Sequence, residues 1–79
     1  MNYNHEIALA ELKKQYPAGC VVELVSMDDQ GAPPKGTKGE VMFVDDIGTV
    51  HVLWKTGSTL GVVSSVDEIR LVPKAPGTG

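Results

Sequence analysis

The stretch "DDIGTVHVLWKTGSTLGV", residues 45–62, contains two strand-like runs, each preceded by turn residues. Within the run "TVHVLW" the residues alternate with the period of two that a half-buried strand shows. The series predicted to face the interior is Val50, Val52 and Trp54, and the opposite series is His51, Leu53 and Lys55. The turns "DDIG" and "KTGS" supply the Asp and Gly residues that tight hairpins require. This stretch therefore predicts consecutive antiparallel strands.

Similar short apolar runs lie on both sides of this stretch. They are "CVVELV" at residues 20–25, "EVMFV" at 40–44 and "IRLV" at 69–72. With 49–54 and 59–63 they make five short strands joined by turns and one long loop, which predicts a small, mainly β domain closed into a barrel. The barrel domain is expected to span residues 17–73.

The run at 40–44 breaks the period of two. Val41 and Val44 both suit the core, yet they are three residues apart, and strict alternation cannot bury both. A β-bulge near Met42 and Phe43 would bury both valines. Alternatively, both faces of this strand are apolar and the N-terminal segment covers one of them.

Residues 4–16, "NHEIALAELKKQY", predict a helix, so that residues 1–16 form an N-terminal helical segment. Leu9, Leu12 and Tyr16 share one helical face, and Pro17 ends the helix because the residue before a proline is pushed out of the helical region. A helix this short is marginal alone, so it must dock on the sheet or on a partner. The tail "PKAPGTG" lacks periodicity, and residues 74–79 are expected to be flexible.

Composition places the chain among ordinary small domains. It has 79 residues, a net charge of −3 and one cysteine, Cys20. The acidic balance argues against a general nucleic-acid partner, although a local basic patch stays open. One cysteine allows no internal disulfide, the N-terminus lacks the features of a signal peptide, and no apolar run is long enough to span a membrane. A bacterial or host-cell cytoplasm is the expected location.

The stretch "PAGCVVELVSMDDQGAPPKGTKGEVMFVDDIGTVHVLWKTGSTLGVV", residues 17–63, carries an ordered set of motifs. Over residues 17–72 the chain resembles the bacterial and phage domain-of-unknown-function family 4314. The resemblance implies an SH3-like β-barrel and a phage or mobile-element setting. It implies no reaction, because none is assigned to the family.

No set of residues meets the roles that catalysis or metal binding requires. The pair Asp45-Asp46 sits in a predicted hairpin turn, where Asp stabilises the backbone through its own side chain. His5, His51 and Cys20 are too scattered to form a recognisable ligand set, and Cys20 opens an apolar strand, as a structural thiol does. The sequence therefore predicts a protein without enzymatic activity, metal or cofactor.

The long loop "SMDDQGAPPKGTKG" is the predicted recognition element. Long loops in compact domains are usually functional or disordered, and adjacent prolines reduce the entropy lost on docking. Trp54 is either an anchor for a ligand or a core residue, and the two possibilities stay open. The candidate binding residues are Asp28, Asp29, Pro33, Pro34, Lys35 and Trp54.

Three functions compete on these observations. The first is a non-enzymatic protein-binding module that uses the loop at 27–38 and the adjoining barrel face. The second is a counter-defence inhibitor that mimics DNA on a nuclease, or sequesters a nucleotide at an oligomer interface. The third is a nucleic-acid adaptor, which the negative charge opposes. We expect a protein partner, and an oligomer stays possible.

Overall fold

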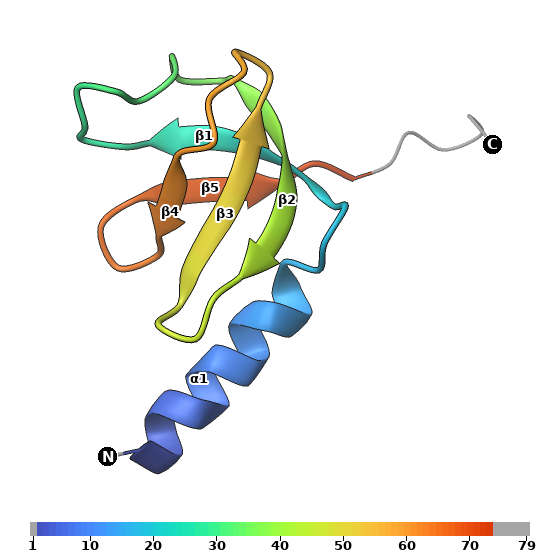
Figure 1. The fold of residues 1–79 in the computed structure, drawn as a ribbon, viewed down its shortest axis with the longest axis vertical. Helices are drawn as coiled ribbons and strands as arrows, with labels where there is room; N and C mark the ends of the chain where they lie inside the picture. The colour runs from blue at the N-terminus through green and yellow to red at the C-terminus, as the bar shows by residue number, and fades with distance from the viewer. Residues whose placement is uncertain (1, 74–79) are drawn as a thin grey trace, which may run out of the picture.

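The computed structural model describes residues 2–73, with side chains from residue 6 onward. The predicted tail at 74–79 lies outside the described residues. One helix is followed by five strands (Figure 1); they are α1 (Asn2–Gln15), β1 (Val21–Ser26), β2 (Lys38–Val44), β3 (Thr49–Trp54), β4 (Gly61–Val63) and β5 (Glu68–Leu71). The mainly β class and the single N-terminal helix are confirmed.

All five strands belong to one antiparallel sheet with the order β4-β3-β2-β1-β5. β4 and β5 follow each other in the chain yet lie at the two edges, joined by a tight turn in which Val66 N–H donates to the Val63 carbonyl at 3.0 Å. Strand pairing does not close the sheet within residues 2–73. The five antiparallel strands are confirmed, whereas closure into a barrel stays a prediction.

The core lies on the concave side of this curled sheet. Its buried side chains are Val22, Leu24, Val41, Val50, Val52, Trp54 and Val62. The predicted alternation in β3 is confirmed, because all three residues of the interior series belong to this core. β-branched valines dominate it, and such residues pack well on a pleated surface.

The predicted bulge in β2 is also confirmed. Val41 pairs with Val52 and Phe43 pairs with His51, so the register shifts by one residue between these pairs. The shift lets Val41 lie in the core and Val44 pack against it, while Phe43 is 52% exposed. The alternative, in which both faces of this strand are apolar and the helix covers one of them, is wrong, because Met42 and Phe43 are both exposed.

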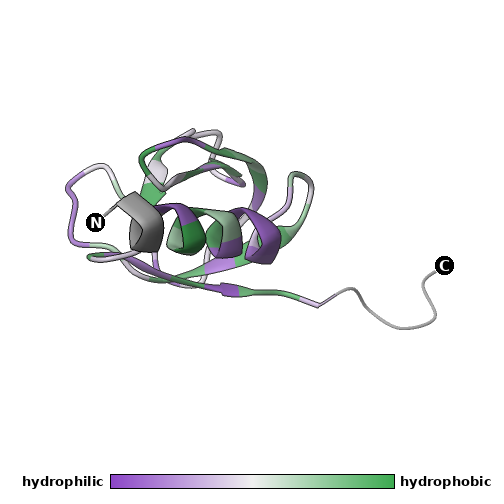
Figure 2. Ribbon diagram, turned by 90° about the horizontal axis from the view of Figure 1, so that it is seen from below, coloured by the Kyte–Doolittle hydropathy of each residue, from purple (hydrophilic) through white to green (hydrophobic). Residues whose placement is uncertain are grey.

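The helix begins and ends earlier than predicted, at Asn2 and Gln15. Tyr16 precedes Pro17 and leaves the helical region for the steric reason given above, although its N–H still bonds to the Leu12 carbonyl at 3.0 Å. Leu12 and Tyr16 pack against the core, while the first turns project past the β2–β3 hairpin (Figure 1). Apolar and polar residues are intermixed along α1 (Figure 2). In the described part of the chain, no helix is long and apolar enough to cross a membrane.

β4 starts at Gly61, two residues later than the predicted run at 59–63. Trp54, the last residue of β3, makes two hydrogen bonds to the segment that precedes β4. Trp54 N–H donates to the Ser58 carbonyl at 2.8 Å, and its indole Nε1–H donates to the Leu60 carbonyl at 3.0 Å. The Leu60 carbonyl is thus taken by the indole, whereas the bond between Trp54 and Ser58 lies in the register of the β3–β4 pairs.

Candidate functional site: the outer face of the sheet

The β1–β2 loop lies at the far end of the sheet from α1 (Figure 1). Asp28, Asp29, Pro34 and Lys35 are exposed there, whereas Pro33 is buried. The Asp29 carboxylate accepts the Gly31 N–H at 2.7 Å, which closes a local turn. The loop therefore exposes four of the five predicted residues to solvent and buries Pro33.

Trp54 does not join these loop residues on the surface. Its side chain is 1% exposed and belongs to the core. Its Nε1–H bonds to the Leu60 carbonyl, so the indole is satisfied without a ligand. The structure therefore favours the core interpretation of Trp54 over the ligand anchor.

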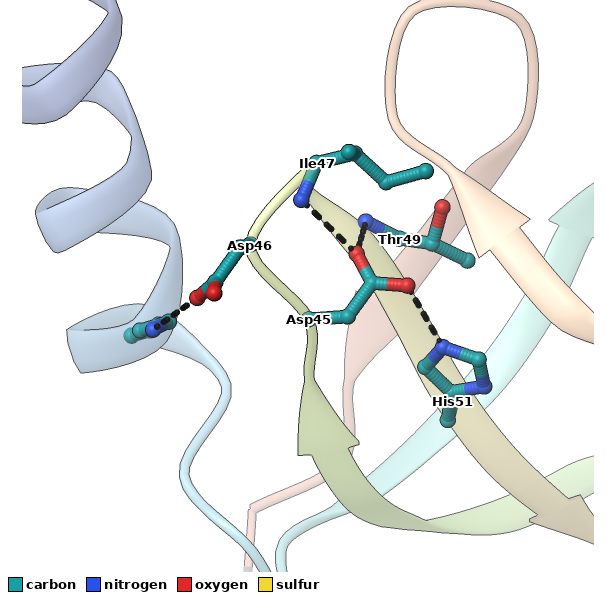
Figure 3. A network of polar contacts seen from close by, with 6 residues as sticks. Asp45, Asp46, Ile47, Thr49 and His51 are labelled. Atoms are coloured by element: carbon teal, nitrogen blue, oxygen red, sulfur yellow. Dashed lines mark hydrogen bonds and ion pairs between the residues drawn. The ribbon is translucent and has the colours of Figure 1, made fainter.

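The β2–β3 turn is organised by the Asp45 carboxylate (Figure 3). Its Oδ1 accepts N–H groups from Ile47 at 3.1 Å and Thr49 at 2.9 Å, and its Oδ2 lies 2.8 Å from His51 Nε2. A carboxylate only accepts, so His51 Nε2 carries the proton in this bond. The bond from His51, and then those from the backbone, hold the pKa of Asp45 below its usual value. The structure thus assigns Asp45 to turn chemistry, as predicted.

Asp46, next along the chain, points the other way and pairs with Lys13 of α1 at 3.4 Å (Figure 3). The turn glycine Gly48 lies beneath Leu12, since a Cβ built on it would meet Leu12 Cδ2 at 3.7 Å. A groove of about 270 Å³ remains between α1, the turn and the end of β4, lined in part by Leu9, Ile47 and Val63. The C-terminal half of α1 therefore lies against the β2–β3 turn.

His51 and Cys20 do not form a reactive centre. The His51 ring stacks on Phe43, with centroids 4.3 Å apart, and donates to Asp45. Burial raises the pKa of the Cys20 thiol, which keeps it protonated at neutral pH and weakly nucleophilic. Among the described residues, no three His, Cys, Asp or Glu side chains gather as a metal site would require.

The larger groove lies on the solvent side of the sheet. We call the exposed side of β1, β2 and β3, together with the residue that follows β3, the outer face; its members are Val21, Lys38, Glu40, Phe43, Leu53 and Lys55. Val21 pairs with Glu40, and Glu40 pairs with Leu53, so these three side chains form one row across the strands. A groove of about 550 Å³ follows this row, with Lys38 and Lys55 on its rim. Leu53 is 45% exposed within it.

A barrel face beside the loop was expected to take part in binding, but the residues of the outer face were not among the predicted site residues. Its signal was present in the β3 alternation, because Leu53 and Lys55 belong to the series predicted to point away from the core. The strand pairs that join this series to Val21 and Lys38 depend on the register of β2, which the bulge alters. The outer face also continues into the predicted loop, because residues 36–37 pair with Leu24 of β1 just before β2 begins.

These features define a small antiparallel β domain that presents an exposed groove on the outer face of its sheet. A family model described as "Domain of unknown function (DUF4314)" matches residues 5–72. The chain belongs to this family. No curated protein and no solved structure matches this chain.

Proposed function

We propose that this domain is a non-enzymatic protein-binding module of a phage or other mobile element, acting in the cytoplasm. The observation that carries the proposal is one row of the outer face, here called the apolar row, in which the exposed apolar side chains of Val21 and Leu53 flank Glu40. Apolar side chains in a groove are what a protein partner can bury, at about 25 cal/mol per Å² of apolar surface. The mobile-element setting rests on the family resemblance alone.

An SH3-like barrel is part of this proposal. The strand order β4-β3-β2-β1-β5 supports it, as do the bulge in β2 and the tight turn that joins the two edge strands. Bulges bend strands, and bent strands are what a small barrel needs. In such a barrel the β1–β2 loop and the outer face would form one continuous recognition surface.

Capture of host proteins by two matched variants tests the proposal. Leu53→Gln places an amide in the outer-face groove, whereas Ile47→Gln makes the same kind of change at an 81% exposed site on the β2–β3 turn. Both side chains lie outside the core, so both variants should fold. We expect the full-length Ile47→Gln protein to retain the proteins captured by the wild type, and Leu53→Gln to lose them. Equal capture by the two variants would refute the proposed surface.

A further inference from the structure

The basic residues of the β domain lie together, although they are scattered along the chain. Residues 17–73 contain Lys35, Lys38, Lys55 and Arg70 as their basic side chains. The Lys55 N–H bonds to the Lys38 carbonyl at 2.9 Å, which places Lys55, the residue after β3, beside Lys38 of β2. Glu23 pairs with Lys38 on one side and with Arg70 on the other. A single row therefore runs across four strands in the order Lys55, Lys38, Glu23, Arg70.

Two lysines in this row make no ion pair with another described residue. The Glu23 carboxylate lies 2.8 Å from the Arg70 guanidinium, so this pair is largely neutral. In the described part of the chain, no ion pair joins Lys38 or Lys55 to a carboxylate. Lys35 is a further exposed lysine close to this row. The next residue, Gly36, lies beside Glu23, because a Cβ built on Gly36 would be 3.8 Å from the Glu23 carboxylate.

The unpaired lysines border the apolar row. Lys38 lies two residues before Glu40 on β2, and Lys55 lies two residues after Leu53, so all four side chains share the outer face. Both lysines are on the rim of the 550 Å³ groove. A ligand in this groove would meet Val21 and Leu53 on either side of Glu40 along one row, and the two lysines beside the Glu23–Arg70 ion pair along the next.

We propose that the groove on the outer face binds an acidic segment of a partner protein, with carboxylates at Lys38 and Lys55 and apolar side chains on Val21 and Leu53. This inference rests on the proposed function and names the partner's chemistry. The positive row lies in a protein of net charge −3, so it is a local exception that favours a negatively charged partner. Burial of the apolar row against the partner would stabilise the complex. The lysines would orient the bound segment and select for acidic ones.

A nucleic acid fits this surface less well. Glu23 and Glu40 lie within the same two rows, so a phosphate backbone crossing the groove would meet carboxylates as well as lysines. A nucleic-acid backbone carries a phosphate at every nucleotide, so phosphates would lie beside the glutamates as well as beside the lysines. A peptide places its carboxylates at chosen positions and offers N–H donors to the glutamates. The mixed charge therefore favours protein.

Selection of peptides on the immobilised full-length protein tests the inference. The probe is a displayed library of random dodecapeptides, and we expect Asp and Glu to be enriched among the selected peptides, interspersed with apolar residues. The double variant Lys38→Gln/Lys55→Gln should bind a selected peptide about tenfold more weakly, since exposed ion pairs contribute about 1 kcal/mol each at most. Lys38→Arg/Lys55→Arg keeps the charge and should retain binding.

Lys13→Gln/Lys14→Gln removes the same number of charges from α1 and should leave binding unchanged. Selected peptides without acidic residues, or equal affinity for the Gln and Arg double variants, would overturn the acidic-partner inference while leaving the proposed function intact. Tighter binding of an oligothymidylate than of any selected peptide would overturn both. Equal capture of host proteins by Leu53→Gln and Ile47→Gln would refute the proposed function itself.

Discussion

Replacing Trp54 by Ala should reduce the free energy of unfolding by about 3–5 kcal/mol, the range for removing a large aromatic side chain from a core. Trp54 is the largest side chain in the core and 1% exposed. The substitution removes its packing against the core valines and also leaves the Leu60 carbonyl without the indole donor. The free energy of unfolding of a native domain is about 5–15 kcal/mol in total, so the expected loss is a large share of the stability.

Urea denaturation followed by far-ultraviolet circular dichroism measures this loss, because Trp54 is the sole tryptophan and its fluorescence disappears in the variant. Trp54→Phe is the matched control, since it keeps an aromatic ring and removes the Nε1 donor. We expect the free energy of unfolding of Trp54→Phe to lie between those of the wild type and Trp54→Ala. If Trp54→Ala unfolds at nearly the wild-type urea concentration, the placement of the indole in the core is wrong.

Gly39→Ala should cost about 1–3 kcal/mol, although it adds one methyl group, because overpacking a tight core forces side chains or backbone to move. Gly39 pairs with Trp54 across β2 and β3. A Cβ at residue 39 would lie 2.5 Å from Val52 Cγ1 and 2.8 Å from Trp54 Cε3. It would also lie 3.0 Å from the Leu53 carbonyl oxygen, which belongs to the backbone and cannot rotate away.

Gly31→Ala is the matched control for this prediction. A Cβ at Gly31 would lie 3.4 Å from the Asp29 carboxylate in an exposed loop, which is ordinary contact. We expect its thermal melting temperature to stay close to the wild-type value, while that of Gly39→Ala falls by several degrees. Equal melting temperatures for the two variants would mean that the sheet does not pass as closely over Gly39 as the structure places it.

Local sequence was enough to predict most of the fold. The alternation of Val50, Val52 and Trp54 identified the buried face of β3, because a strand's side chains change sides at every residue. The unusual spacing of Val41 and Val44 suggested a bulge as one of two explanations, and the structure has the bulge. Gly48 and Gly57, predicted turn glycines, have φ values of 88° and 94°, which side chains with a Cβ rarely adopt.

The candidate site was less accessible to sequence reasoning. The loop with Asp28, Asp29, Pro34 and Lys35 was found because Gly, Pro and Asp interrupt the strand pattern there. The row of Lys55, Lys38, Glu23 and Arg70 was not found, since it depends on three strand pairings between residues distant in the chain. Register is a property of the assembled sheet, and a shift of one residue would have moved these side chains to the core face.

The central claim, that the outer face and not the helix end of the molecule binds a partner, is tested most directly by acetylation of lysines in the captured complex. Mass spectrometry compares the labelling rate of each lysine in the free protein and in the complex. We predict that Lys38 and Lys55 label more slowly in the complex, while Lys13 and Lys14 of α1 label at their free rates. Slower labelling of Lys13 and Lys14, with Lys38 and Lys55 unchanged, would contradict the account and place the partner on the groove beside α1.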